Sequence, residues 1–301
     1  MSRIVLTGAT GFMGSHLMPL LCQQHEVYAL ARREAPSQKG VQWIRQDLAQ
    51  PLDESQLPKN IDTIIHLAQS EHYREFPDQA RDIFRVNVQS TQELLEYARR
   101  AGAKRFILAS SGGVYGASFK QLSETDLVNP LDFYLSSKYS AELLVGNYKQ
   151  FFHVIVFRFF FVYGPRQQRK LIPMLLEKVR SQQVITVDGN AGISVNPIFI
   201  QDAIKVFESA MELQNSDLFN IAGDETVTIA DLAHLCAHTL GLEAKIQTTS
   251  TPLSGDLVGA NIHMKRNLNV TPRTRFSEGL SMMATEVQSR LQAHRCQEVG
   301  R

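Results

Sequence analysis

The stretch MSRIVLTGATGFMGS, residues 1–15, decides the fold expected of this chain. The apolar run IVL at 4–6 predicts a strand, and the apolar residues beyond the turn predict a helix. Between the two stand Gly8, Gly11 and Gly14. A helix N-terminus offers unpaired N–H groups and the positive end of its dipole, and glycines let the backbone approach a phosphate closely. The stretch therefore predicts a site for the pyrophosphate of a dinucleotide.

The spacing of these glycines is Gly-x-x-Gly-x-x-Gly, whereas the dinucleotide fingerprint is Gly-x-Gly-x-x-Gly. An ordinary strand-to-helix turn is the alternative interpretation. The place of the turn, directly after the first strand, favours the nucleotide site.

Composition and charge narrow the class of protein. The 301 residues are 44% hydrophobic and 20% charged, as in a soluble globular protein with one large or two smaller domains. A net charge of +1 argues against a nucleic-acid partner. No apolar run reaches the roughly 18 residues that cross a bilayer, so no membrane partner is expected. The first strand begins too early to leave room for a signal peptide.

The cysteines Cys22, Cys236 and Cys296 lie far apart and form no CxxC pair. This usage indicates a reducing compartment without disulfides, and we expect a cytoplasmic protein. His234 and His238 form an i,i+4 pair, but no cluster of Glu, Cys or Asp joins them, so no metal site is predicted.

Strand and helix patterns alternate along the first half of the chain. Strands that are apolar throughout suit a parallel sheet with helices on both faces, so we expect an α/β fold with a Rossmann-type, doubly wound parallel sheet. The expected strands are 4–7, 27–31, 41–45, 63–68, 105–110 and 154–160, and the expected helices are 12–24, 83–101 and 134–150. The second half is less regular, with helices expected at 170–181, 201–213 and 228–240, an extended segment at 195–200 and a loop at 248–261.

The sequence YLSSK at 134–138 carries the predicted chemistry. On a helix, Tyr134 and Lys138 share one face, and a nearby ammonium lowers the pKa of a phenol, which makes a general base for an alcohol proton. Ser111 follows a predicted strand and could hold the substrate oxygen. An exposed helix that happens to carry a tyrosine and a lysine is the alternative interpretation.

Taken together, the motifs resemble those of the extended short-chain dehydrogenase/reductases, of the NAD(P)-dependent epimerase/dehydratase type. The resemblance covers nearly the whole chain. The matching pieces are TGATGFMGSHL (7–17), QDL (46–48), IIHLAQ (64–69), RVNVQST (85–91), ILASSGGVYG (107–116), YLSSK (134–138), FRFFFVYGPRQ (157–167), NPIFIQDA (196–203) and FNIAG (219–223).

This resemblance implies roles for individual residues. Ser111, Tyr134 and Lys138 match the catalytic residues, and Lys138 also matches the residue that binds the nicotinamide ribose. His66, at the end of an apolar strand, is either structural or beside the cofactor, and Asn87 either supports the site or only caps its helix. The cofactor-binding residues are expected to be Gly8, Thr10, Gly11, Phe12, Met13, Gly14, Arg32, Arg33, Asp47, Leu48, Leu67, Ala68, Asn87, Tyr134 and Lys138.

The end of the second strand bears on the choice of cofactor. Members that prefer NAD carry an acid there, which holds the ribose hydroxyls. Here Ala31 occupies the place and Arg32 and Arg33 follow. Because guanidinium groups bind phosphate, the sequence favours NADP, with NAD as the alternative and solvated loop arginines as the other interpretation.

The residues after Ser111 bear on the reaction. The resemblance implies that dehydratases place acids there, but Gly112 and Gly113 follow, so a dehydratase is disfavoured. We therefore expect hydride transfer at a secondary alcohol or ketone of a nucleotide sugar, by an epimerase or a 4-ketoreductase. The expected substrate contacts are Gln69, Ser111, Gly112, Phe161 and Arg166.

Two alternatives stay open. The first is an NADP-dependent reductase of a non-nucleotide carbonyl. Members that act on nucleotide sugars often have Asn where Phe161 stands and Arg where Val195 stands, and the loss of this amide and this charge weakens the case for a diphosphate substrate. A protein that binds NADP only to sense it is the second, although the presence of Ser111, Tyr134 and Lys138 argues against it.

The resemblance also implies the domain plan. Residues 1–163, with 198–218 returning, would form the dinucleotide domain, and 164–197 with 219–301 a smaller α/β substrate lobe. Relatives often dimerise through the helices predicted at 83–101 and 134–150. The leucines there, Leu94, Leu95, Leu143 and Leu144, permit a homodimer and fit a monomer core equally well.

Overall fold

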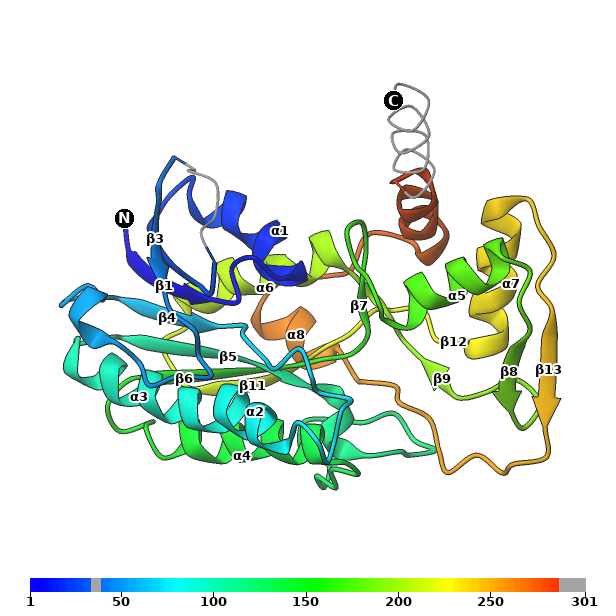
Figure 1. Cartoon of the computed structure of the whole chain (residues 1–301), viewed down its shortest axis with the longest axis horizontal. Helices are drawn as coiled ribbons and strands as arrows, with labels where there is room; N and C mark the ends of the chain where they lie inside the picture. The colour runs from blue at the N-terminus through cyan, green and yellow to red at the C-terminus, as the bar shows by residue number, and fades with distance from the viewer. Residues whose placement is uncertain (34–38, 287–301) are drawn as a thin grey trace.

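Seven parallel strands form the central sheet of the computed structural model, which describes residues 1–33 and 39–286 (Figure 1). Cys296 and the end of the chain lie outside the described residues. The spatial order of the strands is β11 (Asp217–Ile221), β6 (His153–Phe159), β5 (Arg105–Ser111), β4 (Thr63–His66), β1 (Arg3–Thr7), β2 (Glu26–Ala31) and β3 (Val41–Arg45).

Helices cover both faces of this sheet because the strands are apolar on both sides. On β1, Ile4 and Leu6 belong to one apolar cluster and Val5 to the other. The first cluster is completed by α1 (Phe12–Leu21), α6 (Ile200–Glu212) and α8 (Ile262–Asn267), and the second by α3 (Ser90–Arg100) and α4 (Phe133–Gly146). Figure 1 shows α1 and α6 on one face and α3 and α4 on the other. The predicted doubly wound α/β fold is confirmed.

The direction of winding reverses between β1 and β4. From β1 the chain proceeds through β2 and β3 to one edge, and from β4 through β5, β6 and β11 to the other. In open α/β sheets, ligands bind at the carboxyl ends of the strands at such a reversal. The glycine turn follows β1 and therefore lies at this point.

The glycine turn is tight because side chains would clash in it. Gly8 has φ +69°, and a Cβ on it would lie 2.8 Å from the backbone nitrogen of Ala68. A Cβ on Gly14 would lie 2.2 Å from the carbonyl oxygen of Gly8. Gly11 is the N-cap of α1 and has no side chain to satisfy the first N–H groups. These groups are left to face whatever binds in front of the helix.

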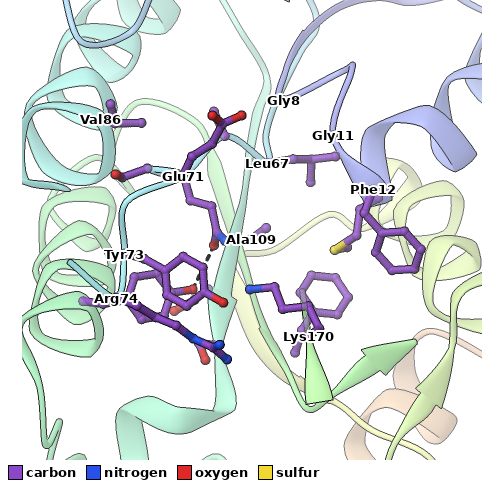
Figure 2. A pocket seen from close by; sticks show the side chains of 18 of the residues that line it. Gly8, Gly11, Phe12, Leu67, Glu71, Tyr73, Arg74, Val86, Ala109 and Lys170 are labelled. Carbon is purple, nitrogen blue, oxygen red and sulfur yellow. Dashed lines mark hydrogen bonds between the residues drawn. The ribbon is translucent and has the colours of Figure 1, made fainter. Parts of the chain in front are cut away.

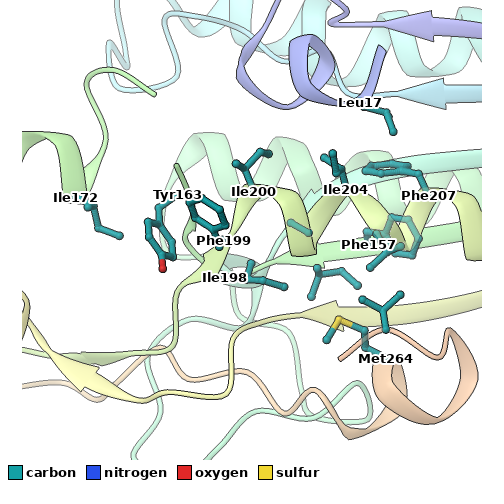
Figure 3. Close-up of a cluster of buried hydrophobic side chains, with 14 of the residues drawn as sticks. Leu17, Phe157, Tyr163, Ile172, Ile198, Phe199, Ile200, Ile204, Phe207 and Met264 are labelled. Carbon is teal, nitrogen blue, oxygen red and sulfur yellow. The ribbon is translucent and has the colours of Figure 1, made fainter. Parts of the chain in front are cut away.

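A smaller lobe extends from the sheet, on the right in Figure 1. It consists of α5 (Leu171–Arg180), α7 (Ile229–Leu240), β8 (Ile185–Asp188), β9 (Ser194–Val195), β12 (Val227–Thr228) and β13 (Ile246–Thr249). The short strands β7 (Val162–Tyr163) and β10 (Ile198–Phe199) pair in parallel where this lobe joins the main sheet. One apolar cluster runs from Leu17 of α1 to Ile172 of α5, as Figure 3 shows, so the two lobes share a core.

The helix predicted at 83–101 is built from three pieces. These are α2 (Ala80–Phe84), a π-helical turn η2 (Arg85–Gln89) and α3. Periodicity does not distinguish a π turn from an α turn, because only one extra residue separates them. The remaining short elements are the 3₁₀ turns η1 (Glu54–Gln56) and η3 (Gly112–Tyr115).

The return to the main sheet extends beyond residue 218. Strand β11 pairs with β6 from Asp217 to Ile221, and Phe219 and Ile221 are fully buried. The boundary predicted at 218/219 therefore falls inside β11, the strand at one edge of the main sheet. Of the leucines named for a possible homodimer, Leu94 and Leu95 are fully buried in the core of the chain, whereas Leu143 is 56% exposed and so available for a contact between two copies.

In the part of the chain that the structure describes, no helix is long and apolar enough to cross a membrane.

Prediction for the glycine turn: Gly14→Ala should lower the free energy of unfolding by about 1–3 kcal/mol, because its Cβ has no room against the backbone of Gly8. Urea unfolding followed by circular dichroism measures it. Gly146→Ala is the control, because nothing lies within 4 Å of a Cβ there. It should leave stability unchanged or raise it, and equal stability losses in the two variants would contradict the explanation.

Candidate active site

A large cleft opens at the carboxyl ends of β1, β4 and β5, with a volume of about 1720 Å³. Its walls come from the glycine turn, the segment after β4, the start of α4 and the segment from Phe159 to Ile172 that enters the smaller lobe. Figure 2 shows Gly8, Gly11 and Leu67 along one part of the cleft and Tyr73 and Lys170 along another. Of the residues predicted from the sequence, those that line the cleft are Gly8, Thr10, Gly11, Phe12, Met13, Gly14, Arg32, Asp47, Leu48, Leu67, Ala68, Gln69, Ser111, Tyr134 and Phe161.

Five predicted residues are not among those that line it. Lys138 and Asn87 lie buried directly behind the cleft wall, at 4% and 3% exposure. Arg33 is exposed to solvent. Gly112 is buried, and a Cβ on it would lie 2.5 Å from the ring of Phe160. Arg166 is turned away, as its contacts show.

Arg166 joins the first helix to the smaller lobe. Its guanidinium donates to Nδ1 of His16 (3.0 Å), and its backbone N–H donates to Glu286 (2.6 Å). In the structure, Gly112 packs against Phe160 and the guanidinium of Arg166 bonds to His16. Neither residue is part of the cleft lining from which a substrate contact was expected.

The two hydroxyl groups of the site are placed by local capping. Asp132 is the N-cap of α4 and accepts from the N–H of Leu135 (2.6 Å), which starts the helix so that Tyr134 lies in its first turn. Ser111 caps η3 and accepts from the N–H of Gly113 (3.2 Å). Both side chains reach the same cleft.

The phenol of Tyr134 donates a hydrogen bond to Oε1 of Gln69 (2.8 Å). Burial raises the pKa of Tyr134, and the neighbouring Tyr73 and Asp132 raise this pKa further. The ammonium of Lys138 donates instead to the carbonyl of Ala109 (2.5 Å). The expectation that Lys138 lowers the pKa of Tyr134 is therefore wrong for this arrangement, because burial dominates and the ammonium points to the end of β5.

The pKa of Lys138 is also shifted far from its usual value. The pKa of Lys138 is lowered to about 8, chiefly because of burial; Glu142 raises this pKa and Lys170 lowers it, and both effects are smaller than that of burial. Glu142 lies one helical turn along α4 and forms a buried ion pair with Arg158 of β6, at 2.6 Å and 5% exposure for each side chain. Ser110 also donates to Glu142. The cluster fixes α4 against β5 and β6. No short sequence pattern marks it, because Ser110, Glu142 and Arg158 belong to three different elements.

A chain of hydrogen bonds runs through His66 at the end of β4. The hydroxyl of Thr91 donates to the carbonyl of Asn87 (2.8 Å), so its oxygen accepts from Nε2–H of His66 (3.0 Å). Nδ1 of His66 is then the acceptor for the hydroxyl of Thr7 (2.7 Å), whose oxygen accepts from the N–H of Ala68 (3.2 Å). The network assigns the neutral Nε2–H tautomer. Of the two interpretations offered for His66, these contacts support the structural one.

Asn87 continues this chain to the helix of Tyr134. Its Oδ1 accepts from the N–H of Ser70 (2.8 Å), and its Nδ2 donates to Oγ of Ser137 (2.9 Å). The Ser137 hydroxyl donates to the carbonyl of Tyr134 (2.6 Å). Asn87 lies in the π turn, whose wider backbone brings its side chain between the β4 loop and α4.

Basic side chains gather at the mouth of the cleft. The ammonium of Lys170, at the N-cap of α5, lies 3.9 Å from the ring centroid of Tyr73, and the guanidinium of Arg74 lies 5.3 Å from the same centroid (Figure 2). The Tyr73 ring lies 5.1 Å from that of Tyr134. Within 1–33 and 39–286, no group of three or more His, Cys, Asp or Glu side chains could hold a metal ion.

The chain belongs to the NAD dependent epimerase/dehydratase family, whose sequence model matches residues 4–222. It is thus an enzyme of the extended short-chain dehydrogenase/reductase type, as the motifs indicated. This family match rests on the same segments that build the glycine turn and the cleft.

Individual relatives support the same assignment. The chain is 28% identical over 304 residues to a protein of Bacillus subtilis (strain 168) described as an uncharacterized UDP-glucose epimerase, covering 93% of this chain and 96% of the relative. It is 27% identical over 251 residues to the dTDP-D-glucose 4,6-dehydratase of Homo sapiens, covering 77% and 72%. The structure of the UDP-glucuronic acid 4-epimerase of Bacillus cereus, with UDP-glucuronic acid and NAD, matches with a TM-score of 0.85 at 26% identity over 95% of this chain and 99% of that one.

Prediction for His66: stability should fall with acid because burial lowers the pKa of His66 to about 3, far below its value of about 6.5 in the unfolded chain. The neutral ring contributes fully above pH 6.5. As the pH falls toward 3, only the unfolded state gains the proton, so up to about 1.4 kcal/mol is lost per pH unit.

The measurement is urea unfolding of the wild type and of His66→Gln between pH 4 and 8.5. The variant should be less stable at pH 8, and its curve should be flatter than that of the wild type below pH 6.5. Above pH 7.5 the two curves should run parallel. Parallel curves over the whole range would contradict a buried neutral His66.

Proposed function

We propose that the protein is an NAD(P)-dependent epimerase that inverts a secondary alcohol of a nucleotide sugar through a transient ketone. One observation carries this proposal: the hydroxyls of Tyr134 and Ser111 and the glycine turn line a single cleft. A hydride carrier held at the turn and an alcohol held at the two hydroxyls would therefore meet in one cavity.

The residues at the turn fit a dinucleotide. A Cβ on Gly8 or Gly14 would collide with backbone, so the turn presents bare N–H groups at the start of α1, where a pyrophosphate is favoured. Asp47 and Leu48 would lie at the adenine and Lys138 at the nicotinamide ribose. When bound, the nicotinamide supplies the hydride acceptor and donor.

Tyr134 is the acid/base in this proposal and Ser111 holds the reacting oxygen. The phenolate takes the hydroxyl proton of the substrate while the hydrogen on the same carbon leaves as hydride, and a ketone results. When the hydride returns to the opposite face of the carbonyl carbon and Tyr134 returns the proton to the oxygen, the epimer results. The ammonium of Lys138 would stabilise the phenolate once it turns from Ala109 toward the phenol.

The basic mouth of the cleft supports an anionic substrate. Lys170 and Arg74 both contact the ring of Tyr73 and would attract the diphosphate of a sugar nucleotide. The relatives with this fold include enzymes whose names give UDP-glucose, UDP-glucuronic acid and dTDP-D-glucose as substrates.

The acids in the cleft favour simple hydride transfer over elimination of water. Asp47 accepts from the N–H of Ala49, Glu71 pairs with Arg32, Asp82 accepts from Ser70, and Asp132 caps α4. Among the described lining residues, Asp47, Asp82 and Asp132 are thus engaged in hydrogen bonds within the chain. Glu71 is 69% exposed in its pair with Arg32, and no acid follows Ser111, because Gly112 and Gly113 stand there. A dehydratase would need a carboxylic acid free for the leaving hydroxyl.

Prediction for catalysis: Tyr134→Phe should lower kcat about 10²–10⁴-fold and leave dinucleotide affinity close to that of the wild type, because only the proton carrier is removed. Epimerisation of UDP-glucose and UDP-glucuronic acid is measured by NMR, and affinity by the fluorescence of the reduced dinucleotide. Tyr148→Phe is the control, since Tyr148 bonds to Glu96, away from the cleft lining. Undiminished turnover in Tyr134→Phe would refute the assignment.

The cofactor is proposed to be NADP, although the Bacillus cereus relative is described with NAD. Arg32 lines the cleft beyond the end of β2, where Ala31 offers no carboxylate to repel a phosphate. Its partner Glu71 is 69% exposed, and such surface pairs contribute roughly 0–1 kcal/mol, so a 2′-phosphate could replace the carboxylate.

Prediction for cofactor choice: Arg32→Ala should weaken NADPH binding about 10–100-fold and change NADH binding little, because a charge-assisted hydrogen bond to the phosphate is lost. Fluorescence titration with both dinucleotides measures it. Arg33→Ala is the comparison, since Arg33 is exposed and does not line the cleft, and it should bind both as the wild type does. Unchanged NADPH affinity in Arg32→Ala would favour NAD.

A further inference from the structure

We propose that Gln69 is a catalytic residue whose side-chain amide follows the proton of Tyr134. Its carbonyl oxygen accepts from the protonated phenol, and its NH₂ group donates to the phenolate. This inference rests on the proposed function, because it takes Tyr134 as the acid/base. It goes beyond the sequence-based role of Gln69, which was a contact to the substrate.

The first observation is the contact itself. Oε1 of Gln69 lies 2.8 Å from the phenolic oxygen of Tyr134, in the cleft that both residues line. Gln69 thus touches the atom that would exchange the proton. In the structure the phenol is the donor, which corresponds to the protonated state of the acid/base.

The second observation is the way the backbone holds Gln69. On one side, the N–H of Ala68 donates to Oγ1 of Thr7 (3.2 Å). On the other side, the N–H of Ser70 donates to Oδ1 of Asn87 (2.8 Å), and the Ser70 hydroxyl donates to Asp82. Since both neighbours are anchored, the side chain of Gln69 starts from a fixed position. Asn87 and Ser137 link the same loop to the backbone of Tyr134.

The chemistry of the amide suits a partner that changes protonation state. A carboxylate only accepts hydrogen bonds and an ammonium only donates, so each suits one state of the phenol. A primary amide offers both ends, and a half-turn about its last torsion exchanges them. Gln69 can therefore hold Tyr134 in place before and after the proton moves, without a charge of its own.

The surroundings of Tyr134 make a donor useful. Burial, Tyr73 and Asp132 all raise its pKa, so they oppose the phenolate that the reaction needs. Tyr73 comes from the loop after β4, and Asp132 from the start of α4. While the phenol is protonated, the nearby cations have other partners, because Lys138 bonds to Ala109 and Lys170 lies over Tyr73. The amide of Gln69 therefore adds to the help that Lys138 gives the phenolate once its ammonium turns toward the phenol. After the half-turn of the amide, its N–H would donate to the phenolate and offset part of this opposition.

The test compares Gln69→Glu and Gln69→Met with the wild type. The ionisation of Tyr134 is followed by ¹⁹F NMR of protein labelled with 3-fluorotyrosine, and the Tyr134 signal is assigned by its loss in Tyr134→Phe. Gln69→Glu should move this ionisation to higher pH by about one unit or more, because a carboxylate can only accept. Gln69→Met should lower kcat about 10-fold with KM nearly unchanged, since one hydrogen bond to the reacting group is lost.

Gln92→Glu is the matched control. Gln92 is exposed on α3 and hydrogen-bonds to Tyr148, so it repeats a glutamine–tyrosine contact outside the cleft lining. It should leave both kcat and the Tyr134 signal as in the wild type. Wild-type kcat in Gln69→Met, or an unmoved Tyr134 ionisation in Gln69→Glu, would overturn the proposal.

The two readouts separate this proposal from the proposed function. If no nucleotide sugar is turned over, the function fails, but the ¹⁹F titration still reports whether Gln69 responds to the proton of Tyr134. If turnover is found and neither Gln69 variant changes it or the titration, the function stands and the role of Gln69 is rejected.

Discussion

The arrangement of the site depends on one chain of buried hydrogen bonds centred on the neutral ring of His66. It begins at β1 with Thr7, crosses β4, and passes through Thr91 to the backbone of Asn87. The side chain of Asn87 then carries it to α4. Each member must be satisfied, because a buried polar group without a partner destabilises the fold by about 1–3 kcal/mol. The chain thus ties the strand that precedes the glycine turn to the helix that carries Tyr134.

A second constraint is the apolar core that the two lobes share. Ile172 of the smaller lobe and Leu17 of the first helix belong to one cluster, and the ring of Phe157 lies within it. Close packing of this kind resists displacement, so the walls of the cleft keep their relation to each other. Lys170, the hydroxyls of Tyr134 and Ser111 and the glycine turn therefore keep their places around one cleft.

Residues of the site that belong to short local motifs were predicted from the sequence, whereas contacts between residues of different elements were not. The glycine turn, Ser111 and Tyr134 belong to short motifs whose geometry is local, and the structure places them in one cleft. The buried pair of Glu142 and Arg158 joins residues from different elements, and no short pattern marks it. The π turn around Asn87 was hidden as well, since its amphipathic pattern matches that of the helices on either side. The direction of the pKa shift of Tyr134 was predicted wrongly because helical spacing reveals neither the burial that raises this pKa nor the carbonyl of Ala109 to which the ammonium of Lys138 bonds.

By itself, the sequence determined the class of fold, the position of the glycine turn and the types of side chain available for chemistry. These follow from periodicity and from glycines that no other residue could replace at such close backbone approach. Only the tertiary structure decided that Gly112 packs against Phe160 and that the guanidinium of Arg166 bonds to His16. It also decided that the ammonium of Lys138 bonds to Ala109 and that Gln69 accepts from the phenol of Tyr134. Those outcomes depend on burial and on partners brought together from distant parts of the chain. Burial requires each polar group to find a hydrogen-bond partner and shifts the pKa of each titratable group in favour of its neutral form.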